Sequence, residues 1–180
     1  MCKRQEEDYY SRKPWLRQAA ESGNVAAKYH YALECDRPEE RRHWLKEAAE
    51  EGYIPAMCDY GLECDDPDER RRLLREAAHE GHVPAMYHYA LECDDPSMRR
   101  RWLQQAAEHG YVAAMHEFGR ECDDPKDTER WLREAAEEGH VQAMYELGLE
   151  SDDPDEKRRW LEKAAQYGLE SAQEALAEVG

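Results

Sequence analysis

The chain has 180 residues, of which 41% are hydrophobic and 37% charged, and its formal net charge is −17 at pH 7. That charge argues against nucleic acid as a ligand, because a phosphate-binding surface depends on Lys and Arg, and it favours solubility and basic partners. No stretch approaches the roughly 18 consecutive apolar residues of a membrane span, and residues 1–14 have no apolar signal region. We therefore expect a soluble, cytoplasmic protein with no membrane contact.

A period of 29 residues organises the chain. Glycine recurs at this spacing at Gly23, Gly52, Gly81, Gly110, Gly139 and Gly168. An aromatic column runs in step with it through Trp15, Trp44, Leu73, Trp102, Trp131 and Trp160. A thiol column contains Cys35, Cys64, Cys93, Cys122 and then Ser151, and a proline column contains Pro38, Pro67, Pro96, Pro125 and Pro154. A fixed period of this length is typical of a repeat architecture.

The first predicted element is a short helix near the N-terminus. Asp8 falls in the column where each repeat has its helix-capping residue, but Pro14 falls where that helix would already be running. A proline inside a helix costs about 3 kcal/mol. We therefore expect the first helix to begin near Pro14.

The third repeat shows the elements that recur along the chain. Asp66 and Pro67 suit the N-cap and first position of a helix, and Gly81 suits its left-handed C-terminal residue, which predicts helix A over about 67–80. A second apolar stripe after a short turn predicts helix B over about 83–93. Helices this short are marginal alone, so each must bury its stripe against its neighbours, which produces a stack.

The boundaries of the repeats follow from this pattern. We expect a single domain over 1–180 that consists of repeats at about 8–36, 37–65, 66–94, 95–123, 124–152 and 153–180. The segment from Ala172 to Val179 lacks the Cys-Asp-Asp-Pro turn and is expected to form a terminal helix that caps the stack.

The run Ala143-Met-Tyr-Glu-Leu-Gly148, followed by Trp160-Leu-Glu-Lys-Ala-Ala165 and Gly168, resembles the Sel1-like repeat family, a relative of the tetratricopeptide repeats. Similar blocks begin at Ala27, Ala56, Ala85 and Ala114. The resemblance implies an all-α fold, a right-handed α-solenoid of six helix-turn-helix repeats with about 12 helices. It also implies a non-catalytic adaptor or scaffold. Family repeats are usually longer than those of this chain.

One column departs from the resemblance. Three residues before each aromatic position the family prefers Ala, whereas this chain has Arg41, Arg70, Arg99, Thr128 and Lys157. These positions lie near the middle of the apolar face of helix A, where a charge needs a partner or a route to solvent. We expect the Arg stems to lie along the core and their heads to bind the end of helix B near Glu63, Glu92 and Glu121.

The cysteines and histidines do not predict a reactive site. Neighbours in the thiol column would exceed the roughly 7 Å Cα separation that a disulfide allows, no Cys-x2-Cys pair exists for zinc, and only Cys58 and Cys64 lie in one repeat. Reduced thiols are expected. His79 and His82 flank a turn, but no third ligand completes a metal site. We expect no catalytic residue, cofactor or metal, and therefore no enzyme.

Acids around each turn from helix B to helix A are followed by bases one helical turn later, which suggests ridges of opposite charge. These ridges are either a solvated face with weak ion pairs or a recognition surface. By analogy with tetratricopeptide arrays, in which helix A lines the concave side, we predict a monomer that binds a protein or peptide, with acidic peptides favoured. The predicted contacts are His43, Lys46, Arg72, Arg75, Arg101, Gln104, Arg130, Arg133 and Arg159.

Two alternatives remain open from the sequence. The acidic chain could mimic DNA and inhibit a nucleic-acid-binding protein, in which case carboxylates would be spaced like phosphates along an outer ridge. The absence of insertions over six copies is also what a consensus-designed or recently expanded array with no evolved partner would show.

Overall fold

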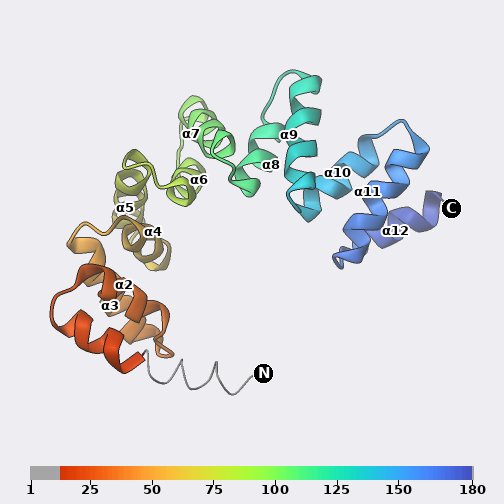
Figure 1. Ribbon diagram of the computed structural model, residues 1–180. Helices are drawn as coiled ribbons and strands as arrows, with labels where there is room; N and C mark the ends of the chain where they lie inside the picture. Colours follow the sequence, from red (N-terminus) through yellow and green to blue (C-terminus); the bar gives the residue numbers. More distant parts are fainter. Residues whose placement is uncertain (1–12, 180) are drawn as a thin grey trace, which may run out of the picture. The chain divides into compact units, whose positions relative to one another are not determined.

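A computed structural model describes residues 13–179 and divides the chain into two compact units, which meet in sequence at Tyr89 and Ala90. The described residues form helices and turns and contain no strand, so the predicted all-α fold is confirmed. In the N-terminal unit a helix over 13–21 is followed by α2 (Val25–Leu33), α3 (Pro38–Glu50), α4 (Ile54–Glu63) and α5 (Pro67–His79) (Figure 1). The predicted helix near Pro14 is therefore present, whereas Asp8 lies outside the described residues.

Helix α6 (Val83–Leu91) contains the division between the units. The C-terminal unit continues with α7 (Pro96–Glu108), α8 (Val112–Arg120), α9 (Pro125–Glu137), α10 (Val141–Glu150), α11 (Pro154–Gln166) and α12 (Glu170–Val179). The helices predicted over about 67–80 and 83–93 are α5 and α6, so their positions are confirmed to within two residues.

Aspartate begins most of the A helices. Asp66, Asp95, Asp124 and Asp153 each accept a hydrogen bond from the backbone amide two residues later, at 2.9–3.1 Å, and proline follows each of them. Such a cap is worth about 1 kcal/mol. Helix α3 differs, because Arg37 at its N-cap makes no side-chain capping bond.

The repeated glycine closes the turn from helix A to helix B. All six of these glycines have a positive φ, between 84° and 96°, and no other described residue does. L-residues with a Cβ rarely adopt this conformation, which explains why glycine occupies the position in every repeat.

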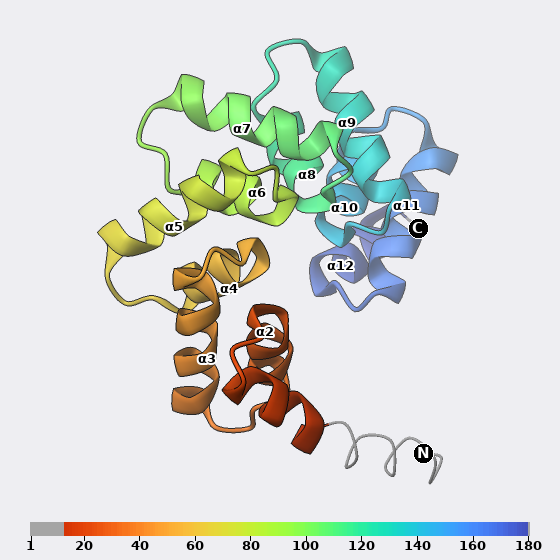
Figure 2. The same cartoon turned by 60° about the vertical axis from the view of Figure 1, so that its left-hand side comes forward.

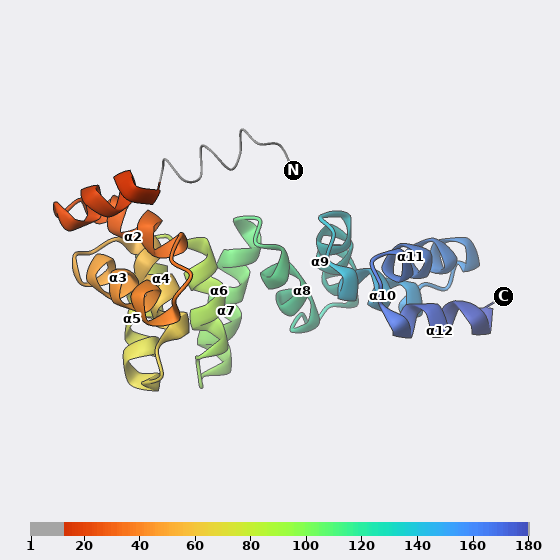
Figure 3. The ribbon, with the colours of Figure 1, turned by 90° about the horizontal axis from the view of Figure 1, so that it is seen from below.

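Within each unit the helices pack in chain order. In the N-terminal unit α3 contacts both α2 and α4, and α2 and α3 lie alongside each other (Figure 2). In the C-terminal unit α11 packs between α10 and α12 (Figure 3). A leucine column after the aromatic positions is buried throughout: Leu16 is 5% exposed, and less than 2% is exposed at Leu45, Leu74, Leu103, Leu132 and Leu161.

Small residues let the two helices of successive repeats approach closely. An ideal Cβ on Gly148 would lie 2.8 Å from the side chain of Leu161, whereas on Gly61, in the same register, its nearest contact would be 3.4 Å from Leu73. Helices α10 and α11 therefore pack more tightly at this point than α4 and α5 do.

Candidate protein-binding surface

The side chains predicted to bind a partner lie on the A helices, and all of them except the half-buried Arg133 are exposed. Most of them are engaged by acids of their own helix. Lys46 contacts Glu50 at 3.8 Å and Arg72 contacts Glu76 at 3.4 Å. The same pattern holds for His43 with Glu47, Gln104 with Glu108, and Arg130 with Asp127.

Three further arginines of this set, Arg75, Arg101 and Arg159, have different surroundings. The guanidinium group of Arg159 lies over the ring of Trp160, 4.9 Å from its centroid. Arg75 and Arg101 have no ion pair within the described residues. The surface is therefore of mixed charge, and these two arginines are its most available cations.

A hollow of about 240 Å³ lies on this surface in the N-terminal unit, between α3 and α5. Met57 and Tyr60 of α4 line its interior, and both are less than 10% exposed. Glu50 of α3 and Arg72 of α5 are among the charged groups around it. An apolar base with a charged rim suits a side chain of a bound polypeptide.

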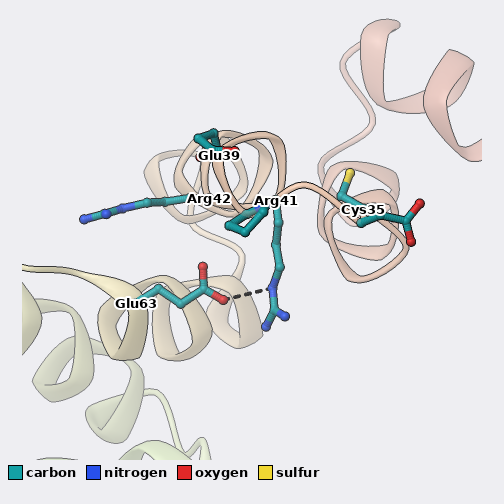
Figure 4. Close-up of a pocket in the computed structure, with 7 residues that line it drawn as sticks. Cys35, Glu39, Arg41, Arg42 and Glu63 are labelled. Carbon is teal, nitrogen blue, oxygen red and sulfur yellow. Dashed lines mark ion pairs between the residues drawn. The ribbon is translucent and has the colours of Figure 1, made fainter.

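The arginines that replace the family's alanine bind the end of helix B, as predicted. Nε of Arg41 lies 2.9 Å from Oε1 of Glu63, and Nε of Arg99 lies 2.8 Å from Oε1 of Glu121. Figure 4 shows Arg41 extending from α3 to Glu63 at the end of α4. The contacts are ionic, because neither buried Nε makes a hydrogen bond. Nη2 of Arg70 donates to the carbonyl oxygen of Cys64 at the end of α4, at 2.8 Å.

The next residue of helix A provides a second ion pair. Nη2 of Arg42 donates to Asp65 at 2.8 Å, and Nη1 of Arg100 donates to Asp123 at 2.8 Å. In the α3–α4 and α7–α8 hairpins, adjacent arginines thus bind one Glu at the end of helix B and one Asp in the turn after it. We call these two residues of helix A the arginine pair. Sequence reasoning predicted the first member and missed the second.

The arginine pair is absent from the α9–α10 hairpin. Its register positions hold Thr128 and Glu129, and the corresponding acids, Glu150 and Asp152, have no ion-pair partner among the residues described. Arg133, one turn further along α9, contacts Glu129 at 2.8 Å and Glu156 at 2.6 Å.

A hollow lies beside the α9–α10 hairpin, which lacks the arginine pair. It has a volume of about 410 Å³ and is lined by α9, the end of α10, the following turn and α11. Trp160 and Leu147 line it and are almost fully buried. Five carboxylates line it against the single guanidinium group of Arg133. The hollow at the end of α4, of about 460 Å³, is nearly balanced, with three carboxylates against Arg41 and Arg42.

Two buried ionisable side chains were missed by the sequence analysis. Lys28 stands in a column that holds methionine in the next four repeats, and its Nζ binds Glu47 and Glu51, both at 2.7 Å. The hydrogen bonds that its ammonium group donates to Glu47 and Glu51 raise the pKa of Lys28. His116 is 4% exposed and its Nε2 lies 3.0 Å from Glu146. The position of Lys28 in a column of methionines was the signal from which its burial could have been predicted.

Side chains also link the B helices of successive repeats. The hydroxyl of Tyr29 donates to Asp59 at 3.1 Å, and His116 and Glu146 stand in the same registers of the C-terminal unit. The ring of His116 stacks on His140, with the centroids 4.4 Å apart.

The cysteines of the described part are free thiols. Cys58 is buried, which raises its pKa to about 12. In the thiol column Cys64 is buried, whereas Cys35, Cys93 and Cys122 are half-buried. The Cys64 thiol donates to Glu69 at 3.6 Å, and the Ser151 hydroxyl makes the equivalent bond to Glu156 at 3.3 Å.

Among the described residues, no group of three or more His, Cys, Asp or Glu side chains is arranged to hold a metal ion. No described helix is long and apolar enough to cross a membrane.

No protein-family model matches this sequence, and no curated protein is significantly similar to it. Solved structures do resemble it. A protective antigen of uropathogenic Escherichia coli strains with an SLR fold is 22% identical, with a TM-score of 0.87 over 93% of this chain and 43% of its own. This chain thus spans less than half of that antigen.

Two further structures are similar. A Sel1 repeat protein from Oxalobacter formigenes is 23% identical, with a TM-score of 0.76 over 84% of this chain and 75% of its own. An immunity protein from Pseudomonas aeruginosa is 20% identical, with a TM-score of 0.59 over 83% of this chain and 67% of its own. The resemblance inferred from the repeats is confirmed, and the chain is an α-solenoid with the fold of Sel1 repeat proteins.

Proposed function

We propose that this chain is a non-catalytic scaffold that binds a protein or peptide on the surface formed by its A helices. The Sel1-repeat fold is generally a scaffold for protein–protein interaction. The observation that carries the proposal is the hollow between α3 and α5, in which Met57 and Tyr60 lie beneath a charged rim.

The acidic-peptide version of the proposal rests on Arg75 and Arg101. Both are exposed and lack an ion pair within the described part of the chain, so an acidic side chain of a partner would meet an available guanidinium group. The other predicted bases already contact acids of their own helices, and an exposed pair of that kind contributes little energy. Arg75 and Arg101 should therefore dominate the charge dependence of binding.

The test is affinity capture with the full chain, followed by mass spectrometry. The Arg75→Glu/Arg101→Glu variant should lose captured proteins that salt also displaces, because screening weakens exposed charge contacts. The matched control, Arg120→Glu/Arg158→Glu, makes the same change of charge at exposed positions outside the predicted set and should retain them. Equal capture by all three proteins would disprove binding through these arginines. Displacement of the partner by DNA would instead favour the DNA-mimic alternative.

A further inference from the structure

The hairpins that contain an arginine pair define how this fold binds guanidinium groups. In α3–α4 and in α7–α8, four arginine-to-acid contacts of 2.8–2.9 Å recur at the same registers. Each site consists of a Glu at the end of helix B, an Asp two residues later, and adjacent arginines on helix A. Each of these hairpins thus contains a receptor made of two carboxylates, and the arginine pair of the same chain occupies it.

The α9–α10 hairpin retains the receptor and lacks its occupant. Glu150 and Asp152 stand where Glu63 and Asp65 stand in α3–α4, both are exposed, and neither has an ion-pair partner in residues 13–179. Glu129 replaces the second arginine and adds another carboxylate. The hollow of about 410 Å³ lies at this place.

The electrostatics of the hollow favour a cationic occupant. Five carboxylates face one guanidinium group, and Arg133 is already shared by Glu129 and Glu156. A clustered negative potential of this kind attracts cations and accelerates their association. Arginine suits the two acids better than lysine, because its planar group donates several hydrogen bonds in a fixed geometry.

Apolar surface next to the acids points to a polypeptide and not to a small cation. Leu147 and Trp160 are apolar residues of the lining, and Leu149, which immediately precedes Glu150 but does not itself line the hollow, is 47% exposed. The position that Leu149 has in its repeat is occupied by the exposed Leu33, Leu62 and Leu91 in other repeats, but by Arg120 in α8. Because the fold accepts a charged side chain at this register, packing does not require the exposed leucine.

We propose that the α9–α10 hairpin binds a partner segment with two adjacent arginines flanked by leucine, which place their guanidinium groups on Glu150 and Asp152. The partner thereby supplies in trans the arginine pair that the chain supplies to itself in the α3–α4 and α7–α8 hairpins. The proposal rests on the scaffold function and specifies the partner's chemistry at one place on it.

The test uses the full chain and a fluorescent peptide, Ala-Leu-Arg-Arg-Leu-Ala, blocked at both ends, with binding followed by fluorescence anisotropy at low ionic strength. The Thr128→Arg/Glu129→Arg variant supplies the missing pair and should weaken binding by about tenfold or more, the loss expected when about 1.4 kcal/mol of contacts is removed. A peptide with two glutamines in place of the arginines should bind neither protein. Circular dichroism verifies that the variant is folded.

Two controls separate the hollow from the overall charge. Glu134→Arg/Ser171→Arg makes the same change of net charge at exposed positions that do not line the hollow, and it should bind the peptide as the wild type does. Arg41→Thr/Arg42→Glu empties the receptor in α3–α4 and should add a second binding site, measured as a doubled stoichiometry in calorimetry.

Equal affinity of the wild type and the Thr128→Arg/Glu129→Arg variant would overturn the proposal. An equal loss in the charge control would also overturn it, as would full competition by spermine at matched charge, because both results indicate nonspecific attraction. The outcome is independent of the test on the helix-A surface, since Arg75 and Arg101 do not line the hollow.

Discussion

The α3–α4 and α9–α10 hairpins share their buried leucine column and differ in surface charge. Their central leucines, Leu45 and Leu132, are both at most 1% exposed. In α3–α4 the arginine pair neutralises the acids at the end of helix B, whereas in α9–α10 these acids are left without a partner. The difference arises at helix-A positions beside the turn, which can change without disturbing the buried columns.

The comparison shows that the residues that stabilise this fold are different from the residues that determine its surface charge. Alanine and leucine fill buried registers of every repeat, and glycine closes every turn from helix A to helix B. The charge at the turns depends on two adjacent positions of helix A. One repeat can therefore acquire a binding site at its acids, while the equivalent acids of other repeats stay paired with arginines of the chain itself.

The largest expected difference between the two hairpins is the response to a methyl group. Gly148→Ala places a Cβ 2.8 Å from the side chain of Leu161 and should destabilise the protein by about 1–3 kcal/mol. Gly61→Ala meets its nearest neighbour at 3.4 Å and should be neutral or stabilising by up to about 1 kcal/mol, since alanine is the better helix former. Thermal unfolding followed by circular dichroism measures both. Equal effects would mean that the packing at the two helix contacts is the same.

A smaller difference is expected from the arginine pair itself. Supplying it with Thr128→Arg/Glu129→Arg should stabilise the chain by about 0.5–1 kcal/mol, because each exposed ion pair contributes only modestly. Arg41→Thr/Arg42→Glu should destabilise by a similar amount. Chemical denaturation measures both changes, and each should shrink at high salt. A stability gain that persists in high salt would show that packing of the arginine stems is responsible.

The smallest expected difference is in pH dependence. His140 is the N-cap of α10 and its Nδ1 accepts from the amide of Ala143 at 3.2 Å, whereas Tyr53 at the start of α4 makes no capping bond. Burial, and secondly the neighbouring His116, lower the pKa of His140. The folded state therefore favours the neutral ring, and stability is lost as pH falls from about 6.5, the unfolded value, through the folded pKa.

His140→Asn tests this by keeping an acceptor for the cap while removing the titration. The variant should lose less stability than the wild type between neutral pH and pH 5, measured by unfolding at several pH values. His82 and His88, whose pKa values burial also lowers, remain in both proteins and cancel in the comparison. Parallel stability profiles would show that His140 does not contribute.

The sequence predicted the fold well because its signals are local and repeated. The aspartate caps, the glycine turns and the apolar stripes each act within one hairpin, and each appears several times. The contact between Arg41 and Glu63 was also predictable, since a charge on an apolar face must reach a polar group.

The candidate sites were harder to predict because they depend on pairings about 23 residues apart. The loss of the arginine pair is visible as Thr128 and Glu129, but its meaning requires knowing that Arg42 reaches Asp65. Weak ion pairs on the helices, such as Arg72 with Glu76, were expected as one of two alternatives, whereas the sequence did not show which bases they leave available. Side-chain direction on the helix decides these pairs, and composition does not reveal it.

The interactions of this chain divide into those within a hairpin, such as Arg41 with Glu63, and those between successive hairpins, such as His116 with Glu146. In a linear array these are the intrinsic and nearest-neighbour terms of an Ising chain. The α9–α10 hairpin retains the neighbour term and lacks part of the intrinsic one, so its order depends more on the adjacent repeats. A ligand in its hollow would restore the intrinsic term, and binding there would be measurable as slower amide hydrogen exchange in α9 and α10.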